Sequence, residues 1–177
     1  MAGALLPAFA VAAALLVIAG AAKITAPAQA VESLRAAGAS IPAVGVRALG
    51  TVEAAIGTAA ALEPSSATAI ALAAAYGCFC LFLLTLIRNG NRNLDCGCFG
   101  GSGAEATPAH VALNATALAV CVAAAIEPPA SVTSLVEHGT FTGLVAAIGI
   151  AACVYAAYLA FTAWPRAWGA YQSGVQR

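Results

Sequence analysis

Charged residues are scarce in this sequence. Its 177 residues include seven Lys or Arg and seven Asp or Glu, so only 8% of the side chains are charged. A soluble globular domain carries about 25% charged residues. Hydrophobic residues instead make up 62% of the chain. The composition therefore excludes a water-soluble domain and predicts a protein that lies in a membrane.

Basic segments are also lacking. The net charge is zero and no run of Lys or Arg occurs, so nothing indicates binding to nucleic acid. No basic residue precedes the first apolar run, whereas a secretory signal peptide opens with a positively charged segment. We therefore expect this run to remain as a transmembrane helix, although the small residues Ala-Gly-Ala-Ala follow it.

Five apolar runs have the length of a membrane helix. About 20 helical residues cross a hydrocarbon layer of about 30 Å, and backbone groups in lipid must be hydrogen-bonded internally, which favours helices. The runs cover residues 4–22, 43–62, 67–87, 108–126 and 141–163. We predict an all-α fold, a polytopic membrane helical bundle with four to five transmembrane helices, in which residues 1–177 form a single membrane domain.

The connecting segments add detail to this prediction. Residues 28–37 are expected to form a short interfacial helix within the first loop. The tight connection at residues 63–66 makes the second and third spans antiparallel neighbours. Thr107-Pro108 is typical of a helix N-cap followed by proline at the first position. The abundance of Ala and Gly predicts helices that pack closely through small residues.

The basic residues predict the orientation in the cell membrane. With five spans, one face collects all of them, and the opposite face has none: Lys23, Arg35, Arg47, Arg88, Arg92, Arg166 and Arg177. Cytoplasmic loops carry an excess of Lys and Arg. We therefore expect an outside N-terminus and a cytoplasmic C-terminus in a multi-pass plasma-membrane protein. The loop 88–107 then lies at the inner surface.

The sequence Cys96-Gly97-Cys98 in this loop is the main candidate site. Close helix packing gives no reason for cysteine in a loop. Gly97 has no Cβ and permits the backbone angles that a bridge between residues two apart would need. Such a ring is strained, and strain makes a disulfide easier to reduce. The motif therefore favours a reversible redox pair over a structural disulfide.

Neighbouring groups both favour and oppose ionisation of the two thiols. A thiol nucleophile needs a stabilised thiolate. Two groups could favour the thiolate: the positive N-terminus of the span starting at residue 108, and His110. Asp95 would oppose it. Two other interpretations stay open: an incidental Gly-rich turn, or a metal site built by Cys96, Cys98 and His110. Zinc sites usually have four ligands, so no metal is predicted, and neither haem, flavin nor quinone motifs are evident.

The other four cysteines lie within predicted spans. Cys121 and Cys153 each continue a row of small residues four apart, which is typical of cysteine as a packing residue. Cys78 and Cys80 point about 200° apart on a helix, so they cannot form a disulfide with each other. We favour packing for them as well, and keep a role in relaying electrons as the alternative.

Glu53 lies near the middle of its predicted span. Ionisable groups inside a bilayer are costly and usually face a partner or a cavity. The sequence leaves open proton uptake coupled to thiol chemistry, an ion pair with Lys23 or Arg47, and a neutral structural carboxyl group. Asn114 follows His110 by one turn and could donate a hydrogen bond to Glu53. For His110 and Asn114 we favour packing and interfacial roles over direct chemistry.

The segment CGCFG at residues 96–100, before a late helix, resembles the signature of the MauE family of methylamine-utilisation membrane proteins, which are related in architecture to DoxX-type proteins. The resemblance runs from about residue 5 to residue 160. Single matches agree with it: Lys23, Glu53 and Asn114. Family members often have Arg-Asn where this chain has Leu113-Asn114, which leaves the role of that position open.

The resemblance implies an integral membrane protein associated with redox chemistry. Such a protein passes reducing or oxidising equivalents to a thioredoxin-like or other thiol protein, or assists maturation of a disulfide-containing exported enzyme. In methylamine-using bacteria the family is linked to maturation of methylamine dehydrogenase. Many relatives occur without that enzyme, so the substrate does not carry over.

Two further classes of function remain open. The first is a non-catalytic membrane subunit or maturation scaffold whose cysteines are structural or hold a metal. If the protein is an enzyme, as the redox hypothesis allows, it is a thiol–disulfide oxidoreductase. Small-molecule transport is a third reading. Maturation of an exported protein requires cysteines at the outer face, whereas the basic residues place this pair inside. A relay through Cys78 and Cys80 would reconcile the two.

Overall fold

The computed structural model describes residues 2–90, 107–131 and 140–163. This part of the chain is helical and contains no strand. The helices are α1 (Ala2–Thr25), α2 (Pro27–Ala36), α3 (Ala43–Leu62), α4 (Ser66–Arg88), α5 (Pro108–Ile126) and α7 (Thr140–Thr162). The predicted all-α fold is confirmed, and the short interfacial helix expected at 28–37 is present as α2.

Four of these helices, α1, α4, α5 and α7, are long and apolar enough to cross a membrane. α3 has 20 residues, which is the required length, but Arg47 and Glu53 make it more polar. The chain is therefore a multi-pass helical membrane protein. Charged groups in a bilayer are costly and usually face a partner or a cavity, so Glu53 is expected to face one or the other.

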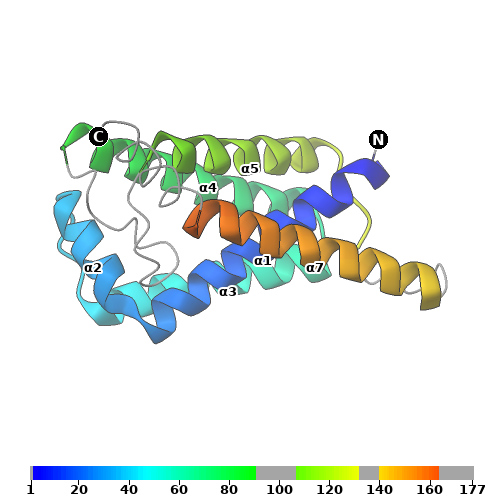
Figure 1. Ribbon diagram of the computed structural model, residues 1–177, viewed down its shortest axis with the longest axis horizontal. Coiled ribbons are helices and arrows are strands. Elements are labelled where there is room, and N and C mark those ends of the chain that lie inside the picture. The colour runs from blue at the N-terminus through cyan, green and yellow to red at the C-terminus, as the bar shows by residue number, and fades with distance from the viewer. Residues whose placement is uncertain (1, 91–106, 132–139, 164–177) are drawn as a thin grey trace, which may run out of the picture.

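The bundle is built from two antiparallel pairs, α1 with α3 and α4 with α5 (Figure 1). Its core lies where the pairs meet and includes Phe9 and Leu16 of α1, Leu72 and Tyr76 of α4, and Cys121 of α5. The hydroxyl of Tyr76 donates a 2.7 Å hydrogen bond to the carbonyl oxygen of Ala12, so this buried hydroxyl is satisfied within an apolar interior. α7 crosses α1 and is mostly exposed along its length.

Glycines allow α1 and α3 to approach closely. A Cβ on Gly50 would lie 2.6 Å from the carbonyl oxygen of Gly20, and one on Gly57 would lie 2.6 Å from that of Ala13. Real Cβ atoms do not approach backbone oxygens so closely, so only glycine fits. The expected packing through small residues is confirmed for this pair.

Candidate functional site

The most polar feature of the described interior is an ion pair between α1 and α3. The ammonium nitrogen of Lys23 lies 2.7 Å from Oε2 of Glu53, and the two side chains are 7% and 4% exposed. Of the readings left open by the sequence, the pair with Lys23 is the one observed. Pairing with Arg47 is wrong, because the Arg47 side chain is exposed and forms no salt bridge within the described residues.

Lys23 and Glu53 are brought together by the spacing of the buried residues along α3. Its buried residues, Val46, Gly50, Glu53, Gly57 and Ala60, recur at spacings of four and three and form one stripe. This stripe faces α1, whose last turn carries Lys23. A Cβ on Gly50 would lie 2.9 Å from the Cβ of Lys23, so the absence of a side chain there makes room for the lysine stem.

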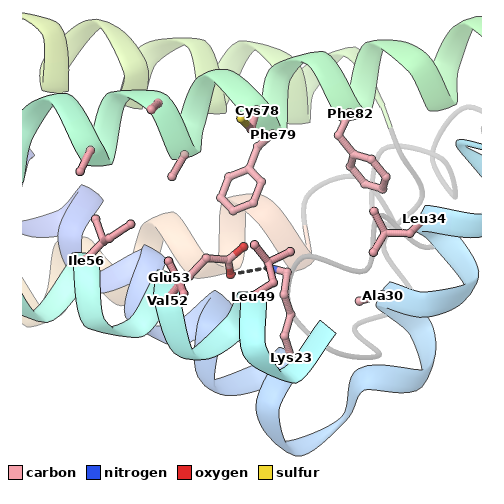
Figure 2. Close-up of a pocket in the computed structure, with 13 residues that line it drawn as sticks. Lys23, Ala30, Leu34, Leu49, Val52, Glu53, Ile56, Cys78, Phe79 and Phe82 are labelled. Atoms are coloured by element: carbon pink, nitrogen blue, oxygen red, sulfur yellow. Dashed lines mark hydrogen bonds and ion pairs between the residues drawn. The ribbon is translucent and has the colours of Figure 1, made fainter. Parts of the chain in front are cut away.

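Phe79 of α4 completes the surroundings of the pair. Its ring centroid lies 5.0 Å from the Lys23 nitrogen, which is within the range of a cation–π interaction. Figure 2 shows the ring extending from α4 toward the pair. Sequence reasoning missed Phe79. Its spacing of three from Phe82, which places both aromatic rings on one side of α4, was the available signal.

A cavity of about 420 Å³ opens between α3 and α4 beside the pair. Lys23 and Glu53 are its charged residues, and Cys78 and the two phenylalanines of α4 contribute to its wall (Figure 2). The remaining lining is aliphatic: Ala30, Leu34, Leu49, Val52, Ile56, Ala71, Ala74 and Ala75. The volume lies within the range of about 300–1,000 Å³ that is typical of small-molecule sites.

His110 links α5 to α7 instead of facing a charged residue. Its Nε2 lies 2.8 Å from the carbonyl oxygen of Phe161. A carbonyl only accepts, so Nε2 carries the proton and donates. Nδ1 then accepts from the backbone N–H of Thr107 at 3.3 Å and contacts its hydroxyl at 2.9 Å. Both ring nitrogens are engaged in holding helix ends, in agreement with the packing role expected for His110.

Removing this link should loosen α7. In His110→Leu the buried hydrogen bond between α5 and the Phe161 carbonyl is lost, and a hydrogen bond of this kind contributes about 0.5–1.5 kcal/mol. We expect a lower free energy of unfolding and faster proteolysis within α7, measured by limited digestion in detergent. Thr116→Val, which removes only an exposed hydroxyl on α5 bonded to its own helix, should leave both unchanged. Equal protease resistance of the two variants would contradict the linking role.

Asn114 does not bond to Glu53, as the sequence suggested it could. Its side-chain nitrogen donates at 2.7 Å to the carbonyl oxygen of His110, one turn earlier on α5. Asn114 also borders a second, much smaller cavity of about 10 Å³ beside Tyr76 and Phe161. It is therefore a buried packing residue near the centre of the bundle.

The cysteines fall into distinct environments. Cys121 is buried in the core, which confirms its packing role. Cys153 is exposed on α7 within the described residues, so the buried packing position expected for it is not observed. Cys78 of α4 lines the cavity between α3 and α4. The Cys80 sulfur instead lies 3.9 Å from the carbonyl oxygen of Val111 on α5. The two point to different neighbours, in agreement with their predicted failure to pair. A relay through them remains a prediction.

Cys96 and Cys98 lie outside the described residues, so their prediction as the redox pair is not addressed by the geometry. Their loop leaves from the end of α4 and returns at the start of α5. Leu83 and Leu86 of α4 are fully buried near these ends and pack against Val111 of α5. Both attachment points of the loop are therefore held by one apolar cluster.

The model of the family described as "Methylamine utilisation protein MauE" matches residues 1–127. The chain belongs to the MauE family. The match covers α1 to α5, including the Cys-Gly-Cys loop, and ends directly after α5; α7 lies beyond it. No curated protein and no solved structure matches the chain. In this MauE-family chain the ion pair, the cavity wall and the cysteine motif all lie within the matched region.

Proposed function

We propose that this MauE-family protein is a membrane thiol–disulfide redox protein in which Cys96 and Cys98 are the exchanging pair. It passes reducing or oxidising equivalents to a thioredoxin-like partner, or assists maturation of a disulfide-containing exported enzyme. The observation that carries the proposal is the Cys-Gly-Cys motif within the part of the chain that matches the family.

The chemistry requires only the two thiols and a partner. A thiolate of the partner attacks the Cys96–Cys98 disulfide, which gives a mixed disulfide and one free thiolate. The second partner thiolate then resolves the mixed disulfide, so that the partner becomes oxidised and the pair is reduced to two thiols. The reverse direction uses the same bonds. The rigid attachment of the loop to α4 and α5 supports this role, because functional loops work from a fixed scaffold.

We propose further that the loop lies at the cytoplasmic surface. The last turn of α1, the helix α2, the first turns of α3 and the last turn of α4 gather at one end of the bundle (Figure 1). These elements carry every Lys and Arg of the described residues: Lys23, Arg35, Arg47 and Arg88. The positive-inside rule supports placing that end in the cytoplasm.

Trapping the mixed disulfide tests the function. A Cys98→Ser variant has no second thiol of its own to resolve a mixed disulfide formed through Cys96, and Cys96→Ser has none for one formed through Cys98, so release depends on the partner's second thiol alone and is slowed. We expect one of them to accumulate a reducible adduct with another thiol protein, detected by non-reducing electrophoresis and mass spectrometry. The matched control is Cys153→Ser, which changes an exposed cysteine of α7 and should trap nothing.

Maleimide labelling before and after reduction gives the second readout. In the native protein we expect part of the population to contain the Cys96–Cys98 disulfide. In these molecules the two cysteines react with maleimide only after reduction. Permanently free thiols, with no adduct in either single variant, would refute the redox function. A stable protein complex that survives the double Cys→Ser change would then favour the scaffold role.

A further inference from the structure

The cavity between α3 and α4 combines an apolar wall with two charged residues at its base, as ligand-binding sites often do. We call these two residues, Lys23 and Glu53, the polar floor. The cavity wall consists of aliphatic residues and the rings of Phe79 and Phe82, while Lys23 and Glu53 lie at its base (Figure 2). Leu49, Val52 and Cys78 are exposed at its rim, although the interior pair is almost fully buried. An apolar molecule can therefore enter along the faces of α3 and α4 and reach two charged groups.

Both members of the ion pair have polar atoms that can form further hydrogen bonds. An ammonium group has three N–H donors, and among the described residues Lys23 donates one of them, to Oε2 of Glu53. The other carboxylate oxygen, Oε1, accepts from no described residue, and the Glu53 side chain is 4% exposed. The cavity floor thus offers a donor and an acceptor side by side, with a net charge of zero.

The Lys23 donor and the Glu53 acceptor determine which kind of ligand can bind in the cavity. An anionic head group such as a fatty-acid carboxylate would bring a second negative charge next to Glu53, which is unfavourable in a low-dielectric site. Ester lipids provide acceptors but no donor for the free carboxylate oxygen. A quinol satisfies both groups, because its hydroxyl oxygen can accept from Lys23 while its O–H donates to Oε1 of Glu53.

We propose that this cavity binds the head group of a membrane-soluble quinol, with a hydroxyl group at the Lys23–Glu53 pair and the apolar tail leaving between α3 and α4. The ring lies among Ile56, Phe79 and the alanines of α4, where aromatic contacts are available. The oxidised quinone offers acceptors but no donor, as an ester does, so the site favours the quinol. It goes beyond the proposed thiol chemistry and does not depend on Cys96 or Cys98.

Filling the cavity tests the proposal. Ala74 lines it and is exposed, so Ala74→Phe places a ring in the cavity without disturbing the core. We expect purified protein in lipid nanodiscs, kept under reducing conditions, to bind decylubiquinol saturably, and Ala74→Phe to weaken that binding at least tenfold. Ala115→Phe, the same change on an exposed position of α5 outside the cavity, should bind like the unmodified protein. Equal affinities of the two variants would overturn the proposal.

A competition experiment tests the role of the polar floor. Decylbenzene has a ring and the same tail but no oxygen, so we expect it to displace labelled decylubiquinol at least tenfold less effectively than unlabelled decylubiquinol does. Equal displacement would show an apolar groove that takes any lipid chain, and would overturn the quinol assignment. Binding by a Cys96→Ser/Cys98→Ser variant should be retained, which separates failure of this site from failure of the redox pair.

Discussion

Replacing Glu53 by Gln is expected to destabilise the protein by about 3–5 kcal/mol, because it leaves the buried Lys23 ammonium without its counter-charge. The Lys23 nitrogen lies 2.7 Å from Glu53, and its side chain is 7% exposed, so bulk water solvates the unpaired ammonium poorly. The interaction with the Phe79 ring remains, but it recovers only a part of the lost energy, about 0.5–2 kcal/mol. Chemical unfolding in detergent micelles measures the change.

A second variant separates the charge effect from the change in shape. In Lys23→Met/Glu53→Gln both charges are absent, and the loss of stability should be much smaller than in Glu53→Gln alone. Replacing a whole buried pair by neutral groups is often close to neutral. The surface control is Glu32→Gln, at an exposed position of α2, where we expect a change within about 0.5 kcal/mol. Comparable stabilities of Glu53→Gln and Glu32→Gln would show that the pair does not hold α1 to α3.

The second large effect is expected at Gly57. In Gly57→Ala the new Cβ would lie 2.6 Å from the Ala13 carbonyl oxygen and 2.8 Å from a methyl group of Val17. The backbone oxygen cannot move away by a side-chain rotation, so α1 and α3 must separate. Overpacking of this kind costs about 1–3 kcal/mol. The cost outweighs the gain of up to about 1 kcal/mol in helix propensity on replacing glycine by alanine.

The matched control for this variant is Gly77→Ala on α4. A Cβ at Gly77 meets nothing within 4 Å, so only the gain in helix propensity remains. We expect Gly77→Ala to be neutral or slightly stabilising, and Gly57→Ala to lower the thermal unfolding midpoint in the same detergent. If both variants unfold at the same temperature, close packing of α1 on α3 does not contribute to stability.

Much of the fold could be predicted because lipid restricts the choice of structure. An apolar run of sufficient length must form a helix when no water is present to bond its backbone. The predicted spans 43–62 and 108–126 coincide with α3 and α5, and the Thr107-Pro108 signal marks the start of α5. The cysteine motif and the family were also recognisable from residues 96–100, since both depend on local sequence.

The contacts between helices were harder to predict. In a soluble helix an apolar stripe marks the buried face, but in a membrane the lipid-facing side is apolar as well. Cys121 is buried and its neighbours in the row, Ala117 and Ala125, are half-buried, whereas Gly149 and Cys153 of the similar row are exposed on α7. Sequence spacing treated the two alike, and only the position of each helix in the bundle distinguished them.

The sequence by itself determined a multi-pass helical membrane protein with a cysteine pair in one loop, because composition and run length decide what a chain can do in lipid. Only the tertiary structure decided that Glu53 pairs with Lys23 and not with Arg47 or Asn114, and that a cavity lies beside that pair. The choice depends on which helix faces lie together. Those faces are selected by small differences in packing between side chains that are almost equally apolar.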